Sequence, residues 1–350
     1  MGSGAMAATM TLTAASLAEA QITAIASSDS KRAQSFAERF GIPHISSSAL
    51  ELASRSDVDA IYIANRPSDH VKAAMAAIHA GKPVLLEKPF AITAEQGAAL
   101  VAEARARRCL LVENLWCLSL PAYRELAARF ESGEYGKAVH LNFDFGYPMD
   151  PAAHPSLFDI TDGGVLRDRA VYGVSLALQL LGPVQTLRSS VLHNSKGLDV
   201  AAALQLTHVN GAVSQLAFAI NALMSNSATL ACTRGALRLN APTIGAEAIS
   251  AGRMSPLTAL DALKRPGGKG RLVARLKTIP ALRRLNRWRS ALRTSHHPYG
   301  PGPYRPVLEH FCELVRTTQT ESPLMPLDLS LNTLRLVEAA RHADHSSLEI

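Results

Sequence analysis

Three polar side chains, drawn from two distant parts of the sequence, have types and spacings that suit chemistry on a bound ligand. Lys88 lies in Glu87-Lys88-Pro89, directly after the apolar run Val84–Leu86. A charged pair after a buried parallel strand lies at the edge where open α/β sheets bind ligands. Asp168 and Tyr172 are four positions apart, so on a helix they share one face, a turn apart. The two segments predict one site with contributions from both.

Each of these motifs also has a purely structural alternative. The charged pair Glu87-Lys88 is alternatively a surface ion pair, and a tyrosine on a mostly apolar helix is often only a core residue. The helix around Tyr172 is expected to start after Gly163-Gly164 and to end at Gly182-Pro183.

A glycine-rich segment at the start of the chain is the expected phosphate site. The run Gly2-Ser3-Gly4-Ala5-Met6-Ala7 fits the pattern GxGxxA, which places a tight turn and a helix N-terminus against a pyrophosphate. Small residues near an N-terminus match this pattern often. The apolar segment 22–26 strengthens the interpretation, because it ends about twenty residues on, where such domains bind the adenosine ribose. The expected contacts in the loop are Gly2, Gly4, Ala5 and Met6.

The residues after segment 22–26 favour NADP over NAD. Ser27 and Ser28 stand where an acidic residue would select NAD, and Lys31 and Arg32 lie close behind them. Hydroxyls and nearby cations can hold a 2′-phosphate, whereas an acid at the strand tip holds an unmodified ribose. The alternative is that Lys31 and Arg32 only form the solvated face of the next helix.

The elements that position these residues follow two different patterns. Residues 1–115 alternate short apolar runs with helical stretches, which predicts a Rossmann-type, doubly wound parallel sheet. Residues 116–350 contain longer alternating strands and two hairpins, which predict an α+β domain with an open, mainly antiparallel sheet. The turn Asn210-Gly211 suits type I′. The expected strands are 22–26, 60–64, 83–86, 110–113, 139–146, 201–208, 212–220, 229–233 and 236–239, and the expected helices are 32–40, 70–80, 93–107, 121–132, 305–316 and 328–342.

Composition narrows the class of protein. Hydrophobic residues make up 47% of the 350 residues and charged residues 19%, so the chain can bury the cores of two domains. Its four cysteines are far apart and form no CxxC pair, which argues against a disulfide scaffold or a structural zinc site and fits a reducing cytoplasm. The uncharged run 211–233 contains Ser, Gln and Asn, so it is expected to be strand and not a membrane span. We expect a soluble, cytoplasmic protein that needs no metal.

The basic charge is concentrated in one segment. Residues 251–297 hold twelve Lys and Arg against Asp261 and contribute +11, so the rest of the chain carries −4 of the formal net charge of +7. Within residues 264–293, apolar residues recur every three or four positions between arginines, which predicts a basic amphipathic helix. Its ligand would be an anionic membrane surface, a polyanion or a nucleotide-sugar diphosphate; the alternative is an apolar face docked on the sheet. Nucleic-acid binding is not expected, because Trp288 is the only aromatic residue there that could stack on a base.

Taken together, these motifs resemble the glucose–fructose oxidoreductase/inositol dehydrogenase (Gfo/Idh/MocA) family along essentially the whole chain. The likeness rests on the glycine loop, on the run from Ala80 to Pro89, on Gly163–Tyr172 and on the segments that begin at Tyr304 and Glu321. The nearest branch looks similar to the dihydrodiol and xylose dehydrogenases, because Glu113-Asn-Leu-Trp116 reads alike and Tyr172 stands where inositol dehydrogenases place His.

The resemblance implies hydride transfer between a nicotinamide and a carbinol carbon of a sugar, cyclic polyol or sugar derivative. Tyr172 would be the general acid/base, and the Lys88 ammonium would lower the pKa of its phenol. Asp168 would orient Lys88 or a substrate hydroxyl. NADP is the expected cofactor, with NAD as the alternative, and a homo-oligomer through the open sheet is the expected assembly. The matching positions around the nicotinamide are Asn65, Arg66, His70, Glu87 and Lys88.

Three departures from the family pattern bear on these expectations. The family begins with a strand before the glycine loop, whereas Met1 stands at the loop itself, so we expect unpaired backbone groups inside the sheet. Either the start site lies further upstream or the polypeptide is defective. Asn65-Arg66-Pro67 replaces the usual Thr-Pro, and Arg167 and Arg169 add cations that face either an anionic substrate or solvent. A non-catalytic ligand-sensing or scaffold relative, like the galactose-regulon repressors, is the competing interpretation.

Overall fold

The computed structural model describes residues 1–254, 279–280, 292–342 and 348–349. The basic helix expected over 264–293 lies outside the described residues, apart from positions 279–280 and 292–293. Among the described residues, no helix is both long and apolar enough to cross a bilayer.

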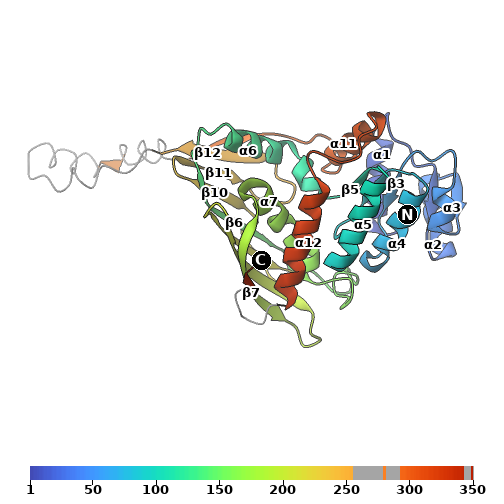
Figure 1. Cartoon of the computed structure of the whole chain (residues 1–350), viewed down its shortest axis with the longest axis horizontal. Coiled ribbons are helices and arrows are strands. Elements are labelled where there is room, and N and C mark those ends of the chain that lie inside the picture. The colour runs from blue at the N-terminus through green and yellow to red at the C-terminus, as the bar shows by residue number, and fades with distance from the viewer. Residues whose placement is uncertain (255–278, 281–291, 343–347, 350) are drawn as a thin grey trace, which may run out of the picture.

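The first part of the chain alternates strands and helices, as the sequence predicts (Figure 1). Asp29 accepts a hydrogen bond from the Arg32 amide and Thr93 from the Gln96 amide, so each caps a helix, and Gly41 ends the first of these in a left-handed conformation. The elements are α1 (Ala5–Ala15), β1 (Ala24–Ala26), α2 (Ser30–Phe40), β2 (His44–Ser46), α3 (Ala49–Ala53), β3 (Ile61–Ile63), α4 (Pro67–His79), β4 (Val84–Leu86), α5 (Ala94–Ala106) and β5 (Leu111–Glu113).

All strand pairs in this part are parallel, but they form two separate sheets among the described residues: β1–β2 and β3–β4–β5. The backbone of Met1 and Gly2 lies between β1 and β3. The Gly2 amide donates to Ala26 O (2.9 Å), and Met1 O accepts from the Ala64 amide (2.8 Å). The Met1 amino group donates to Tyr62 O (2.5 Å). The expected gap between β1 and β3 is therefore present among the described residues. Only Met1 and Gly2 bridge it, through hydrogen bonds to Ala26, Tyr62 and Ala64.

The second part is built on a nine-stranded sheet in the order β13–β12–β11–β10–β6–β9–β8–β7–β14. Every neighbouring pair is antiparallel except β6–β9. The fold class predicted from the sequence is thus confirmed. The strands are β6 (Ala138–Gly146), β7 (Val184–His193), β8 (Asp199–His208), β9 (Val213–Ala219), β10 (Ala228–Cys232), β11 (Gly235–Leu239), β12 (Ala248–Arg253), β13 (Arg293–His296) and β14 (Leu348–Glu349).

The helices of this part pack on one face of the sheet, toward the first part (Figure 1). A 3-10 turn, η1 (Trp116–Ser119), leads into α6 (Pro121–Glu131), and a π-helical turn, η2 (Leu166–Ala170), leads into α7 (Val171–Leu181). Near the C-terminus follow α11 (Arg305–Arg316) and α12 (Leu327–His342). The predicted type I′ turn at Asn210-Gly211 is wrong, because only Gly211 has a positive φ (+85°) and type I′ requires two such residues.

Helix α12 joins the two parts. Its Leu327 and Leu334 belong to the core under β3–β5, whereas Leu336 and Val337 belong to the core under the large sheet. The Glu338 carboxylate accepts a hydrogen bond from the Ala94 amide at the start of α5 (2.9 Å). Both cores therefore share one helix, which fixes how the two parts meet.

Candidate active site

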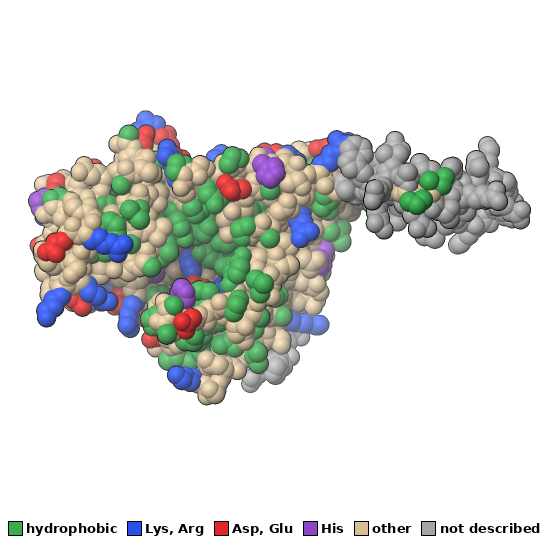
Figure 2. Space-filling view, turned by 180° about the vertical axis from the view of Figure 1, so that it is seen from behind, with side chains coloured by type: hydrophobic (Ala, Val, Ile, Leu, Met, Phe, Trp, Pro, Cys, Tyr) green, Lys and Arg blue, Asp and Glu red, His purple; other side chains and the backbone are tan. Residues whose placement is uncertain are grey.

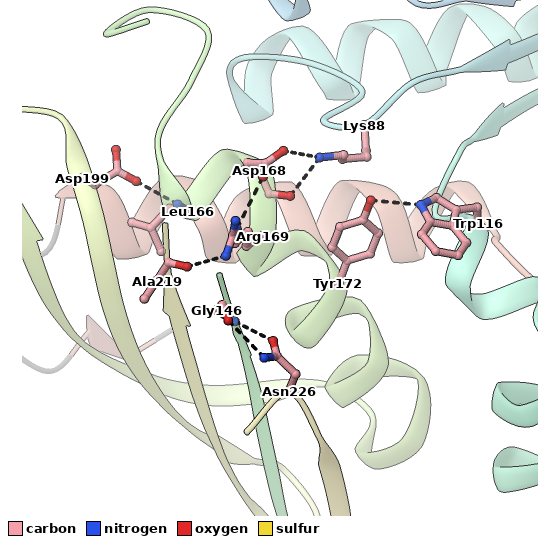
Figure 3. A network of polar contacts seen from close by, with 10 residues as sticks. All are labelled: Lys88, Trp116, Gly146, Leu166, Asp168, Arg169, Tyr172, Asp199, Ala219 and Asn226. Carbon is pink, nitrogen blue, oxygen red and sulfur yellow. Dashed lines mark hydrogen bonds and ion pairs between the residues drawn. The ribbon is translucent and has the colours of Figure 1, made fainter. Parts of the chain in front are cut away.

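Lys88 and Asp168 meet where the two parts of the chain face each other (Figure 3). Lys88 follows β4, and Asp168 lies in the π-helical turn η2. The Lys88 Nζ donates to Asp168 Oδ1 (2.5 Å) and to the Asp168 backbone oxygen (2.9 Å). Burial acts to raise the pKa of the Asp168 carboxyl, but the Lys88 ammonium outweighs it and holds that pKa below its usual value. The surface ion pair considered for Glu87-Lys88 is not found, because Lys88 pairs across the domains and Glu87 is buried.

Tyr172 lies in the first turn of α7, directly below this ion pair (Figure 3). Its ring centroid is 5.3 Å from Lys88 Nζ, and its hydroxyl accepts a hydrogen bond from Trp116 Nε1 (3.1 Å). Because the indole nitrogen only donates, the hydroxyl hydrogen of Tyr172 remains available for another acceptor. The amine and the phenol predicted from distant motifs therefore converge.

The expected lowering of the Tyr172 pKa is wrong for the protein alone. Burial raises the pKa of the phenol well above its usual value, and the neighbouring Tyr304 and Asp168 raise it further. Lys88 does not reverse this shift, since its ammonium is paired with Asp168. Tyr172 is thus a neutral phenol near neutral pH.

Arg167 and Arg169 are committed to the protein, so they do not point freely to solvent or to a ligand. Arg169 is 2% exposed; its guanidinium donates to Ala219 O, lies 4.6 Å from the Phe145 ring centroid and approaches Asp168 Oδ2 (3.7 Å). The guanidinium of Arg167 donates to Thr161 O. The Asp168 carboxylate therefore lies between two cations, the Lys88 ammonium and the Arg169 guanidinium.

Two buried carboxyls lie behind Lys88. Glu87 accepts hydrogen bonds from the Tyr62 hydroxyl and from Asn114 Nδ2 (2.6 Å each), and burial raises its pKa. Glu113 Oε1 accepts from the Phe90 amide (3.0 Å), its Oε2 has no hydrogen-bond partner among the described residues, and burial raises its pKa to about 7. Sequence reasoning placed Glu87 among the cofactor contacts, but its carboxylate faces the protein interior.

The glycine loop fits a dinucleotide phosphate. Gly2 has φ +101° and a Cβ there would lie 2.4 Å from Ala64 O, so only glycine allows the close approach to β3. Within the part of the chain that the structure describes, a Cβ on Gly4 would meet no atom within 4 Å, and no side chain caps α1 at this N-terminus. The first amides of α1, at Ala5 and Met6, are therefore open to an anion.

Of the residues after β1 that were expected to bind the adenosine ribose, one lies beside the glycine loop and three are exposed. Ser27 is half-buried, and its Oγ lies 3.3 Å from Ser3 Oγ, beside the glycine loop. Ser28 and Lys31 are exposed. Arg32 is also exposed and pairs with Asp29 (3.1 Å), which is partly the solvated arrangement considered as the alternative.

Helix α4 contacts the turn that follows Lys88. Its buried His70 contacts Pro89 O through Nδ1 (2.8 Å) and Asn65 O through Nε2 (3.3 Å), whereas Arg66 is exposed. His70 thus supports the turn after Lys88 from within and is 1% exposed, so it is no direct ligand contact. The same helix begins with a contact that sequence reasoning missed: the Asp162 carboxylate accepts from the Ser68 amide (2.8 Å) and from its hydroxyl (3.2 Å).

Figure 2 shows a hollow between the two parts, with hydrophobic side chains along its wall and Lys or Arg atoms at its floor. Aromatic rings surround the phenol of Tyr172: Trp116 and Phe145 lie edge-on to it, and Tyr304 packs on Trp116 with 4.7 Å between centroids. In the part of the chain that the structure describes, no group of three His, Cys, Asp or Glu could hold a metal ion. The arrangement can bind a nucleotide phosphate and transfer a proton.

Comparison with known proteins shows the family to which the chain belongs. Residues 1–115 match the family model of an oxidoreductase family with an NAD-binding Rossmann fold, and residues 123–238 match that of the GFO/IDH/MocA C-terminal domain. The human trans-1,2-dihydrobenzene-1,2-diol dehydrogenase is 30% identical over 227 residues, which are 64% of this chain and 67% of that protein. A dTDP-3,4-didehydro-2,6-dideoxy-alpha-D-glucose 3-reductase from Streptomyces antibioticus is 30% identical over 221 residues (63% and 67%).

Solved structures show the same fold over nearly the whole chain. A levoglucosan dehydrogenase in complex with NADH and levoglucosan superposes with a TM-score of 0.81 at 19% identity, covering 99% of this chain and 97% of that one. An open conformation of a 3-ketoreductase from Actinomadura kijaniata, in complex with TDP-benzene and NADP, gives a TM-score of 0.70 at 25% identity and covers 95% and 92%. On the sequence matches and the fold together, the chain belongs to the Gfo/Idh/MocA family of NAD(P)-dependent oxidoreductases.

Proposed function

We propose that this protein transfers a hydride between a nicotinamide and a carbinol carbon of a sugar, a cyclic polyol or a sugar derivative. The observation that carries the proposal is the convergence of Lys88, Asp168 and Tyr172 from the two parts of the chain. An ion pair and a phenol with a free hydrogen are what proton transfer to a substrate oxygen requires. The division into a cofactor domain (1–115) and a substrate domain (116–350) belongs to the same proposal.

The proposed cofactor is NADP. Gly2, Gly4 and the first amides of α1 would hold the pyrophosphate, and Ser27 would face the adenosine ribose, with Ser28, Lys31 and Arg32 near a 2′-phosphate. The absence of an acid at the tip of β1, where one would select NAD, supports this choice. Bound there, a nicotinamide supplies the hydride chemistry that no side chain can provide.

The side chains account for the proton. Tyr172, a neutral phenol whose oxygen accepts from Trp116, donates its own hydrogen to a carbonyl oxygen in the reductive direction. The Lys88 ammonium beside the ring then stabilises the phenolate, and the Trp116 N–H stays bound to it. In the oxidative direction the same phenolate takes up the proton of the substrate hydroxyl. Asp168 holds Lys88 in place throughout.

The proposed substrate class is supported by the aromatic rings around Tyr172 and by the relatives. Rings of Phe145, Trp116 and Tyr304 near the phenol suit a cyclic substrate with an apolar face. The relatives are named for a cyclic diol and for deoxysugar nucleotides. Either would present a ring carbinol to Tyr172.

Replacement of the phenol tests the proposal. In a panel of aldoses and cyclic diols with NADP, we expect Tyr172→Phe to lower kcat at least ~100-fold, because the proton donor is lost while the ring remains. Tyr135→Phe, at a buried tyrosine of the same domain, should behave like the unmodified protein. Unchanged turnover in the Tyr172 variant would remove that residue from the mechanism.

We also propose that the open face of the large sheet joins a second copy. A shallow depression of about 560 Å³ lies on this face over β6 to β9, lined by exposed polar side chains that include Gln205 and Gln215. Sedimentation should then show a dimer or larger species, and Gln205→Glu with Gln215→Glu should weaken it. A monomer at micromolar concentration would contradict the proposal.

The competing interpretation is a non-catalytic sensor or scaffold of the same fold. It predicts ligand binding without turnover. Measuring reduced-nicotinamide absorbance over the same panel separates the two, because only an oxidoreductase changes it.

A further inference from the structure

A loop of the second domain reaches the first domain next to the proposed site. Asp162 is 8% exposed, and its two oxygens accept hydrogen bonds from the amide and the hydroxyl of Ser68. Ser68 lies in the first turn of α4, where amides have no partner within the helix. The carboxylate therefore caps a helix of the other domain, an arrangement that both hydrogen bonding and the helix dipole favour.

The loop holds Asp162 in this position through its own contacts. Asp159 Oδ1 accepts from the amides of Thr161 (2.8 Å) and Asp162 (3.0 Å), which fixes the turn before the carboxylate. After it, a Cβ on Gly163 would lie 2.2 Å from Leu157 O, and one on Gly164 2.2 Å from Asp199 Oδ1. These close approaches leave the loop little freedom.

Two short connections lead from the Asp162–Ser68 contact to the Lys88–Asp168 pair. Along the chain, Asp162 precedes Asp168 by six residues, and Asp199 fixes the intervening segment by accepting from the Leu166 amide (2.8 Å). Within α4, His70 follows Ser68 by two residues, and its ring contacts Pro89 O, one residue after Lys88. One contact thus constrains both partners of the ion pair.

We propose that Asp162 is a positioning residue that locks helix α4 to the second domain and so sets the distance between Lys88 and Asp168. This role rests on the proposed function, since it concerns the same site. It assigns the N-terminus of α4 to domain docking and leaves that of α1 to the cofactor. Among the hydrogen bonds of the described residues, the Asp162 carboxylate bonds Ser68 and none of Lys88, Asp168 and Tyr172, so it acts through this geometry.

Hydrogen exchange at the Ser68 amide tests the contact directly, with no substrate needed. In the unmodified protein, the amide should be protected; Asp162→Ala should speed its exchange at least ~10-fold, because a first-turn amide then faces solvent. Asp162→Asn keeps an acceptor oxygen and should retain part of the protection. Asp150→Ala is the matched control, since Asp150 caps only Ala152 in the same loop (3.0 Å).

Kinetics tests the consequence. We expect Asp162→Ala to lower kcat about tenfold with the dissociation constant for NADP changed less than about twofold, because misplaced reacting groups slow the chemical step and not cofactor binding. Asp162→Asn should recover most of kcat. A structural defect would instead weaken cofactor binding and kcat together.

Two results would overturn the inference: unchanged exchange at Ser68 in Asp162→Ala, or lost protection with kcat unchanged. Failure of the proposed function gives a different pattern, in which the unmodified protein turns over no carbinol while Ser68 exchange still responds to Asp162. The two proposals can therefore fail separately.

Discussion

Two helices of the first domain, α1 and α4, have N-termini that are used differently. Among the described residues, no side chain caps α1, and a Cβ on its N-cap residue Gly4 would meet no atom within 4 Å. At α4, Asp162 from the second domain already occupies the first turn. A helix N-terminus attracts negative charge in both places. We infer that the N-terminus of α1 is an anion site for a ligand, whereas that of α4 is a contact between domains.

The strongest way to break this comparison is to fill the free N-terminus with a carboxylate as well. Gly4→Asp should raise the dissociation constant for NADP about 100-fold, because the new charge repels the pyrophosphate, while the helix itself is stabilised by its new cap. Cofactor fluorescence titration measures the effect. Gly4→Asn has the same shape without the charge and should lose about tenfold or less; equal losses in both variants would show that α1 does not bind an anion.

A substitution at the end of β1 tests the choice of cofactor, and its expected effect is smaller. Ser27→Asp should shift the preference from NADP toward NAD about tenfold, since an acid at the tip of β1 repels a 2′-phosphate and accepts from ribose hydroxyls. The ratio of kcat/KM for the two cofactors measures this preference. An unchanged ratio would mean that Ser27 does not face the ribose.

Glu113 is expected to change stability and not ligand binding, because it is a buried carboxyl that caps neither α1 nor α4. Its pKa of about 7 in the folded protein exceeds the ordinary value, so the folded state holds a proton that the unfolded state releases between about pH 4.5 and 7. Stability is thus lost as pH rises through this range, by up to about 3 kcal/mol.

Glu113→Gln stays neutral and should remove this dependence. Its Tm should exceed that of the unmodified protein by a few degrees at pH 8, and the difference should vanish near pH 4.5. Glu95→Gln, at an exposed position, serves as the control. Parallel Tm profiles for Glu113→Gln and the unmodified protein would contradict the assignment.

Much of the fold could be predicted because its signals are local. Thr93 and Asp29 start their helices as caps, Gly41 ends one, and alternating runs such as 201–208 form strands of the large sheet. Short or polar strands could not be predicted. β2 and β13 have no apolar alternation, and their pairing depends on neighbours far along the chain. The turn type at Asn210 failed because the residue pair alone does not fix both φ angles.

The site likewise has features that the sequence predicts and features that it does not. Lys88, Asp168 and Tyr172 lie in motifs with recognisable spacing, and the structure brings them together. The pKa of Tyr172 could not be predicted, because it depends on burial and on Tyr304, 132 positions away. Nor could the Asp162–Ser68 contact, which joins residues 94 positions apart by backbone geometry that leaves no pattern in the sequence.

A crystal structure of the protein with NADP tests the central claim most directly. The account predicts the pyrophosphate on the amides of Ala5 and Met6, and the nicotinamide ring beside Lys88 and Tyr172, with its C4 about 3–3.5 Å from the position of a substrate carbon near the Tyr172 hydroxyl. A dinucleotide bound elsewhere, or a nicotinamide ring separated from Lys88 and Tyr172 by packed side chains, would contradict it.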